Sequence, residues 1–122
     1  MRSKQDPDQA QAERQRQARE QLLAKGAKDV PPRPWRPAPI PLSAVDLTQF
    51  AVSRPDLSND DLLAALTLLP AARAEVEEVE SGLLFLARSS GLTWAEMADA
   101  MGFSSPQACQ QRFNRLAARM DS

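Results

Sequence analysis

The stretch from residue 91 to residue 120 constrains the fold most, because its local signals predict two short helices joined by a tight turn. Thr93 and Glu96 have the spacing of a capping box, in which the two side chains bond the first free N–H groups of a helix. Gly102 follows the apolar residues of this helix and can adopt the left-handed conformation that ends it. The first of the two helices is therefore expected between Thr93 and Gly102.

Ser105 and Pro106 predict where the second helix begins. Proline biases the preceding residue away from helical dihedral angles and is itself suited to the first helical position. Ser105, rather than Ser104, is therefore the expected N-cap. Residues 102–104 then form a connection of about three residues, the length typical of DNA-binding helix-turn-helix motifs, and we expect such a motif at residues 93–119.

The second helix, residues 105–119, divides into an apolar seam and a polar face. Cys109, Phe113, Leu116 and Met120 recur at helical spacing and predict the buried seam. The opposite face and its flanks carry amide and guanidinium groups, which read base edges or hold phosphates in protein–DNA complexes. The candidate DNA-binding residues are Ser105, Gln107, Gln110, Gln111, Arg112, Asn114, Arg115 and Arg119.

The candidate residues have different expected roles. If the N-terminal half of the helix enters the major groove, its amides at Gln107, Gln111 and Asn114 face base edges. The arginines are expected to engage phosphates. Arg112 has a second interpretation, because on the flank of the seam it can instead pair with an acidic residue of a preceding helix.

The rest of the chain predicts a small all-α bundle. With 122 residues, of which 43% are hydrophobic, it can bury a modest core, and no alternating β-branched stretch indicates a strand. Helices are expected at residues 43–52, at 58–69, where Ser58 is the N-cap, and at 71–90, after Pro70. Residues 43–122 are therefore interpreted as one helical domain.

The helix at residues 71–90 is expected to be the core helix. Its predicted buried face consists of Ala72, Val76, Val79, Leu83, Leu86 and Ala87. Its other side carries Glu75, Glu77, Glu78 and Glu80. This acidic side is interpreted as a solvated face, or alternatively as a surface for a partner.

The first 42 residues contain two segments of different character. Residues 1–29 are polar and basic, and we expect an arm, helical or disordered, that is exposed and can contact phosphates. Residues 30–42 hold six of the ten prolines and are interpreted as a semi-rigid linker and domain boundary. Two alternatives for this segment are a ligand for an aromatic-lined groove and an Arg-Pro arm in a minor groove.

The charges are segregated along the chain, although the net charge is only −1. Residues 1–37 carry nine Lys/Arg against five Asp/Glu, residues 38–102 three against ten, and residues 103–122 three against one. The pI near 5.4 is far below the value above about 9 that is typical of strongly basic DNA-binding domains. DNA binding thus depends on this segregation.

The composition argues against catalysis. The chain has no histidine, one cysteine placed on the apolar seam, and no glycine-rich phosphate loop. We therefore expect no enzyme activity, no catalytic residue, no metal site and no cofactor. The N-terminus has no apolar signal region, and no run approaches the ~18 apolar residues of a membrane span, so a cytoplasmic, nucleoid-associated protein without membrane contact is expected.

Residues 83–116 carry a recognisable pattern of motifs, at Leu84-Phe85-Leu86-Ala87-Arg88, Gly91-Leu92-Thr93-Trp94-Ala95-Glu96, Ala98, Gly102, Ser105-Pro106-Gln107-Ala108, Gln111-Arg112-Phe113 and Arg115-Leu116. This pattern resembles the helix-turn-helix of a group of small actinobacterial DNA-binding and transcriptional-regulator proteins, and more loosely that of sigma-factor region four. The resemblance covers about a third of the chain and none of its first 55 residues. The resemblance implies DNA binding by the second helix and no catalytic activity.

Two functions are consistent with these observations. The first is a sequence-specific transcriptional regulator that reads double-stranded DNA with residues 105–119 and acts as two copies, because a single small reading head contacts few base pairs. The second is a protein-interaction adaptor on a helix-turn-helix scaffold. It would bind a regulator, such as a component of the transcription machinery, through the acidic helix 71–90 or the Pro-rich segment.

Overall fold

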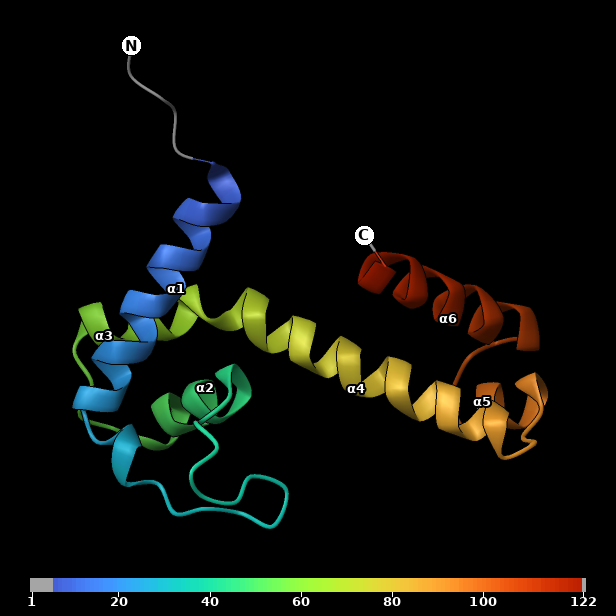
Figure 1. The fold of residues 1–122 in the computed structure, drawn as a ribbon, viewed down its shortest axis with the longest axis horizontal. Coiled ribbons are helices and arrows are strands. Elements are labelled where there is room, and N and C mark those ends of the chain that lie inside the picture. Colours follow the sequence, from blue (N-terminus) through green and yellow to red (C-terminus); the bar gives the residue numbers. More distant parts are fainter. Residues whose placement is uncertain (1–5, 122) are drawn as a thin grey trace. The chain divides into compact units, whose positions relative to one another are not determined.

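The computed structural model describes residues 6–121, with the side chains of residues 6–119, and this part of the chain is helical without strands. The predicted all-α class is confirmed. The elements are α1 (Pro7–Ala24), the 3₁₀ turn η1 (Ala27–Asp29), α2 (Ala44–Ser53), α3 (Asn59–Thr67), α4 (Leu69–Ser89), α5 (Trp94–Met101) and α6 (Pro106–Asp121) (Figure 1). The chain forms two compact units, which divide between Arg73 and Ala74, inside α4.

The helix starts of the first unit follow from local side-chain chemistry. Ser43 and Asp46 form a capping box at α2, and Ser58 and Asp61 form one at α3. In each box the serine hydroxyl accepts from the aspartate N–H, and the carboxylate accepts from the serine N–H. α4 begins at Leu69, two residues before the predicted start, so Pro70 lies in the first turn, where its missing N–H leaves no gap in the helix.

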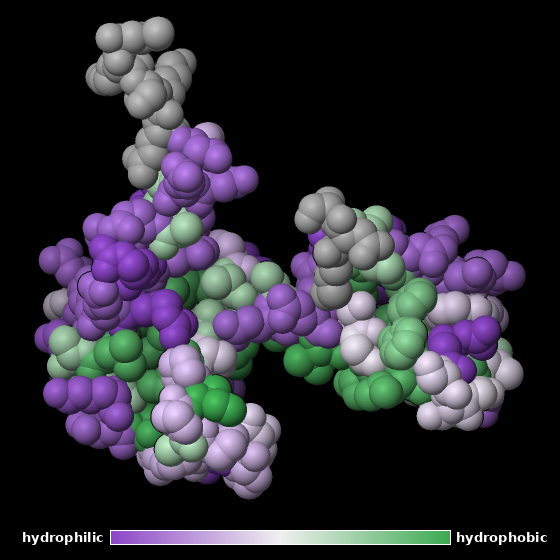
Figure 2. Space-filling view, in the orientation of Figure 1, coloured by the Kyte–Doolittle hydropathy of each residue, from purple (hydrophilic) through white to green (hydrophobic). Residues whose placement is uncertain are grey.

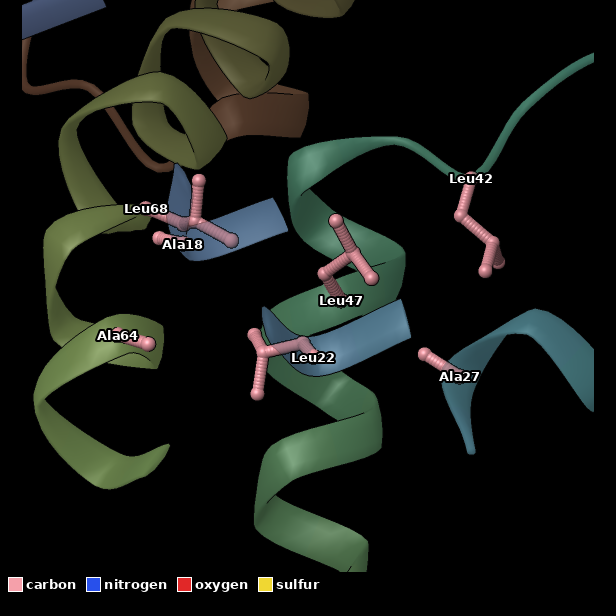
Figure 3. Close-up of a cluster of buried hydrophobic side chains, with 7 residues drawn as sticks. All are labelled: Ala18, Leu22, Ala27, Leu42, Leu47, Ala64 and Leu68. Atoms are coloured by element: carbon pink, nitrogen blue, oxygen red, sulfur yellow. The ribbon is translucent and has the colours of Figure 1, made fainter. Parts of the chain in front are cut away.

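The core of the first unit lies between α1, α2 and α3 (Figure 3). Its buried residues are Ala18, Leu22, Ala27, Leu42, Leu47, Ala64 and Leu68. Residues 7–24 thus form a packed helix, in contrast to the exposed arm expected from the sequence. The few apolar residues of α1 suffice because Ala18 and Leu22, one turn apart, lie on the same side of the helix.

Asp61 links α1 to α3 at the edge of this core. Its carboxylate is buried, accepts a hydrogen bond from Gln21 Nε2 at 2.9 Å, and lies 3.2 Å from Lys25 Nζ. The hydrogen bond from Gln21, followed by those from Ser58 and Lys25, lowers the pKa of Asp61 to about 2. The same carboxylate therefore both caps α3 and holds α1 against it.

The Pro-rich segment, residues 30–42, belongs to the first unit. Arg36 is only 7% exposed, donates to the Pro31 carbonyl at 2.9 Å, and places its Nε 2.9 Å from Asp46 Oδ2, although without hydrogen-bond geometry. Leu42 is buried in the core, whereas Trp35 is 77% exposed. The segment is therefore held at its last residue by Leu42 and in its middle by Arg36, an arginine that the sequence pattern did not single out.

The buried face of α4 within the second unit differs from the prediction. Leu84 is buried, with Ala87 packed beside it, whereas four of the six residues predicted to form the buried face, Val76, Val79, Leu83 and Leu86, are 57–62% exposed. Figure 2 shows this hydrophobic surface over the second half of α4. The helix has more apolar positions than one face can bury, so periodicity alone selects the wrong side.

Candidate nucleic-acid interface

The predicted caps at the start of α5, at its end and at the start of α6 are confirmed. Thr93 N–H donates to Glu96 Oε1 at 2.9 Å, and Glu96 N–H donates to Thr93 Oγ1 at 3.0 Å. Gly102 ends α5 with φ 78°, a left-handed conformation that favours glycine. Ser105 Oγ accepts from the Ala108 N–H at 3.1 Å, as expected of the N-cap of α6.

α6 is anchored by its predicted apolar seam. Cys109 and Leu116 are completely buried against Leu84, Met97 and Ala98. Burial raises the pKa of the Cys109 thiol, so this cysteine is a core residue with little thiolate character. The side chain of Met120, the fourth predicted seam residue, lies outside the described residues.

Trp94 and Phe113 complete this core from its edge. Their ring centroids lie 5.7 Å apart with tilted planes, a favourable arrangement for an aromatic pair. Arg88 lies over the Trp94 ring at 4.6 Å and donates to the Leu92 carbonyl at 2.9 Å. The role of Arg88 was not predicted, because no local sequence pattern connects an arginine on α4 with a tryptophan on α5.

The outward face of α6 presents the predicted amides. Gln107, Gln110, Gln111, Asn114 and Arg115 are all exposed. In the described part of the chain, their side chains make no hydrogen bond or ion pair. Gln107, Gln111 and Asn114 follow one another at helical spacing over about 10 Å of the helix. This face can therefore place three unengaged amide groups against an external surface.

Two of the three arginines of α6 are engaged with α4 instead. Arg112 donates to both carboxylate oxygens of Glu80, at 3.0 Å from Nε and 2.8 Å from Nη2, and this pair lowers the pKa of Glu80. Arg119 pairs with Glu77. The structure thus shows the alternative that the sequence left open for Arg112, and it adds an acidic partner for Arg119.

The charge of the second unit is unfavourable to a polyanion overall. From residue 74 onward the sequence has four arginines against seven acidic residues. Arg115 is the exposed arginine of α6 for which the described structure shows no acidic partner. Contacts to an anionic ligand on this face would therefore rely mainly on neutral amides and on Arg115.

An apolar groove lies between α4 and α5, and none of the α6 amides lines it. It has a volume of about 390 Å³. Its lining residues are Glu80, Leu83, Leu84, Ala87, Leu92, Glu96, Met97, Ala100 and Met101. No sequence pattern predicts this groove, because it arises from the packing of two helices.

Comparison of the chain with family models, curated proteins and solved structures finds no match. Within the described residues, no helix is long and apolar enough to cross a membrane. The same residues contain no group of three or more Cys, Asp or Glu side chains placed to hold a metal ion.

Proposed function

We propose that the chain is a sequence-specific DNA-binding regulator, in which α5 and α6 form a helix-turn-helix and α6 reads the major groove of double-stranded DNA. The observation that carries this proposal is the row of exposed, unengaged amides Gln107, Gln111 and Asn114 on the outer face of α6. Such amides make paired hydrogen bonds with adenine edges. A helix anchored by a buried seam, with this row on its free side, has the chemistry of a reading helix.

The neighbouring residues have supporting roles in this proposal. Arg115, one residue after Asn114, is placed to bond a guanine edge or a phosphate. Ser105 caps α6 through the Ala108 N–H. Its capping role holds the first turn of α6, where the helix would meet the DNA, in a fixed conformation.

The engaged arginines predict weak, sequence-dependent binding. Arg112 and Arg119 are paired with Glu80 and Glu77, so few cations are free to release counterions from DNA. We therefore expect a shallow dependence of affinity on salt concentration. For Arg112 or Arg119 to contact a phosphate, each arginine would have to exchange its glutamate partner for phosphate oxygens.

Selection from a pool of random duplexes tests the proposal without knowledge of the operator. The full-length chain should enrich a common motif, and Gln111→Ala should lose preference for that motif while retaining binding to random duplexes. Gln49→Ala, on an exposed position of α2, is the matched control and should enrich the same motif as the wild type. Enrichment that is identical for Gln111→Ala and the wild type would reject α6 as the reading helix.

A salt titration addresses phosphate contact separately. Arg115→Ala should weaken binding to all duplexes and reduce the slope of log K against log salt by about 1, since it removes one phosphate or base contact. Gln110→Ala, on the flank of the same helix, keeps the charge and should leave the slope unchanged. An unchanged slope for Arg115→Ala would place the electrostatic contact elsewhere on the chain.

The second candidate is a protein-interaction adaptor that binds a regulator through α4 or the Pro-rich segment. It is favoured by the acidic excess of the second unit and by the pairing of Arg112 and Arg119 with carboxylates. The two functions differ in one measurement, duplex binding by the full-length chain at low salt. Absence of any duplex affinity under those conditions would favour the adaptor.

A further inference from the structure

The part of α4 that belongs to the second unit carries a stripe of exposed apolar side chains. The stripe consists of Val76, Val79, Leu83 and Leu86, each 57–62% exposed, and it begins after the buried Ala72. Contiguous exposed apolar surface on a soluble chain indicates an interaction site, whereas single exposed apolar residues are ordinary. The stripe therefore requires a partner surface.

The spacing within the stripe indicates what kind of surface fits it. The four residues follow one another at intervals of three, four and three, which is the a/d pattern of a helix that packs against another helix. A stripe of this kind is complementary to itself, so the same face of a second copy satisfies it without any further partner. We propose that the chain forms a homodimer in which α4 packs antiparallel against α4 of a second copy.

The charges beside the stripe favour the antiparallel orientation. With Val76 at heptad position a, Glu75 occupies a g position and Glu80 an e position. In a parallel pair, the g position of one helix faces the e position five residues further along the other, so Glu75 would lie opposite Glu80 of the second copy. In an antiparallel pair centred near Ser81, Glu75 instead faces Ser89 of the second copy. The two Glu80 side chains approach each other there, but each is already neutralised by its own Arg112.

The position of Gly82 independently supports a helix contact in the middle of α4. It lies in the middle of α4, where glycine disfavours a helix, and a Cβ at this position would meet no atom of the chain within 4 Å. No contact or turn within the monomer explains the glycine. At the centre of an antiparallel pair, its missing side chain lets two helices approach closely.

The groove between α4 and α5 extends the apolar contact beyond the stripe. Leu83 belongs to both, and the rim residues Leu92 and Met101 are themselves more than 40% exposed. A specific interface needs at least about 1,000 Å² of buried surface in total, more than a few side chains alone provide. We therefore include this groove in the dimer surface. The dimer does not depend on DNA binding by α6.

A pair of matched variants tests the dimer. Leu83→Glu introduces a charge into the stripe, whereas Phe85→Glu introduces the same charge on a side chain of equal exposure, 61% against 62%, but on the other side of α4. The molecular mass of the full-length wild-type protein in solution should rise from that of the monomer to that of the dimer as the concentration is raised. Leu83→Glu should raise the dissociation constant roughly 100-fold or more, because two-fold symmetry places each substitution in the interface twice, and Phe85→Glu should leave it near the wild-type value.

Each result of these experiments either supports the antiparallel dimer or overturns it. A wild-type chain that stays monomeric over the whole concentration range overturns the proposal, as does a dimer that both variants weaken equally. Circular dichroism shows whether each variant is folded, and Val79→Glu serves as the second stripe variant if Leu83→Glu is not. In a mixture of Val76→Cys and Leu86→Cys chains, oxidation should cross-link the two variants to each other. Cross-linking of each variant only with itself would show a parallel pair and reject the antiparallel dimer.

Discussion

Asp61 is a buried carboxylate of the first unit on which contacts from two helices converge. Its carboxylate accepts a hydrogen bond from the Ser58 N–H at the start of α3. It also accepts one from Gln21 of α1 and forms an ion pair with Lys25, the residue that follows α1. A buried carboxylate with these partners is held in its charged form, so its pKa falls from the ordinary 3.8 to about 2. Its contribution to stability is consequently dependent on pH.

The pH dependence has a definite direction. Above about pH 4, Asp61 is ionised in both the folded and the unfolded chain, and its full contribution is present. Between about pH 4 and pH 2 only the unfolded chain takes up the proton, so stability falls as the pH is lowered. Asp61→Asn should lower the Tm at neutral pH and flatten this fall, as measured by thermal unfolding across the acid range. Asp60→Asn, exposed on the same helix, is the control, and an equal slope for wild type and Asp61→Asn would contradict the assignment.

Two adjacent serines at the start of α6 allow a second residue-level prediction. Ser105 Oγ accepts from the Ala108 N–H, whereas Ser104 lies exposed one residue earlier in the turn. Ser105→Ala should lower the free energy of unfolding by about 1 kcal/mol, the usual cost of losing an N-cap. Ser104→Ala should change it by less than about 0.5 kcal/mol, as expected for a surface position. Chemical denaturation of both variants measures the difference, and equal effects would mean that the cap is not at Ser105.

At the scale of elements, α4 has several different sides. One side places Leu84 in the core. Beside Leu84, Glu80 pairs with Arg112 and Glu77 pairs with Arg119. Another side bears the exposed apolar stripe. The acidic residues nearest the core thus fix α6 to α4. Because Arg112 and Arg119 are paired with these carboxylates, their charges are not available to a ligand of α6. The packing of α4 therefore affects the proposed function.

Glu80→Gln tests that connection. It removes the bidentate partner of Arg112 and should lower the free energy of unfolding by about 1 kcal/mol, the upper range for partly exposed pairs. If α6 binds DNA, the released Arg112 should also raise duplex affinity and steepen its salt dependence. Glu78→Gln, exposed on α4, removes the same charge without breaking the pair and serves as control. Equal changes in affinity for both variants would mean that only net charge matters.

At the scale of the whole molecule, the described residues form two hydrophobic clusters, one in each compact unit. Leu22 is fully buried in the first cluster and Leu116 in the second. Each unit is small enough for its stability to be marginal, so loss of one large core side chain should open it.

Hydrogen exchange can assign each cluster to its helices. Leu22→Ala should destabilise by about 2–5 kcal/mol and speed exchange of the amides in α1, α2 and α3. Leu116→Ala should do the same for α5 and α6. If both variants speed exchange in the same set of helices, the two clusters do not define separate cooperative units.

The sequence by itself determined the features that depend on residues within one helical turn. The N-cap Ser58, the capping box at Thr93, the left-handed Gly102, the N-cap Ser105 and the exposed row on α6 were all predicted from such short spacings and are confirmed. Each rests on a hydrogen bond or a helical period that operates over at most four residues.

Only the tertiary structure decided the contacts between distant segments. Arg112 and Glu80 are 32 residues apart, Gln21 and Asp61 are 40 apart, and no local pattern states which carboxylate an arginine or an amide will meet. The same holds for α4, where several faces are apolar and the choice of Leu84 over Val79 depends on how α5 and α6 pack against it. The face left over is the stripe that we assign to a second copy of the chain.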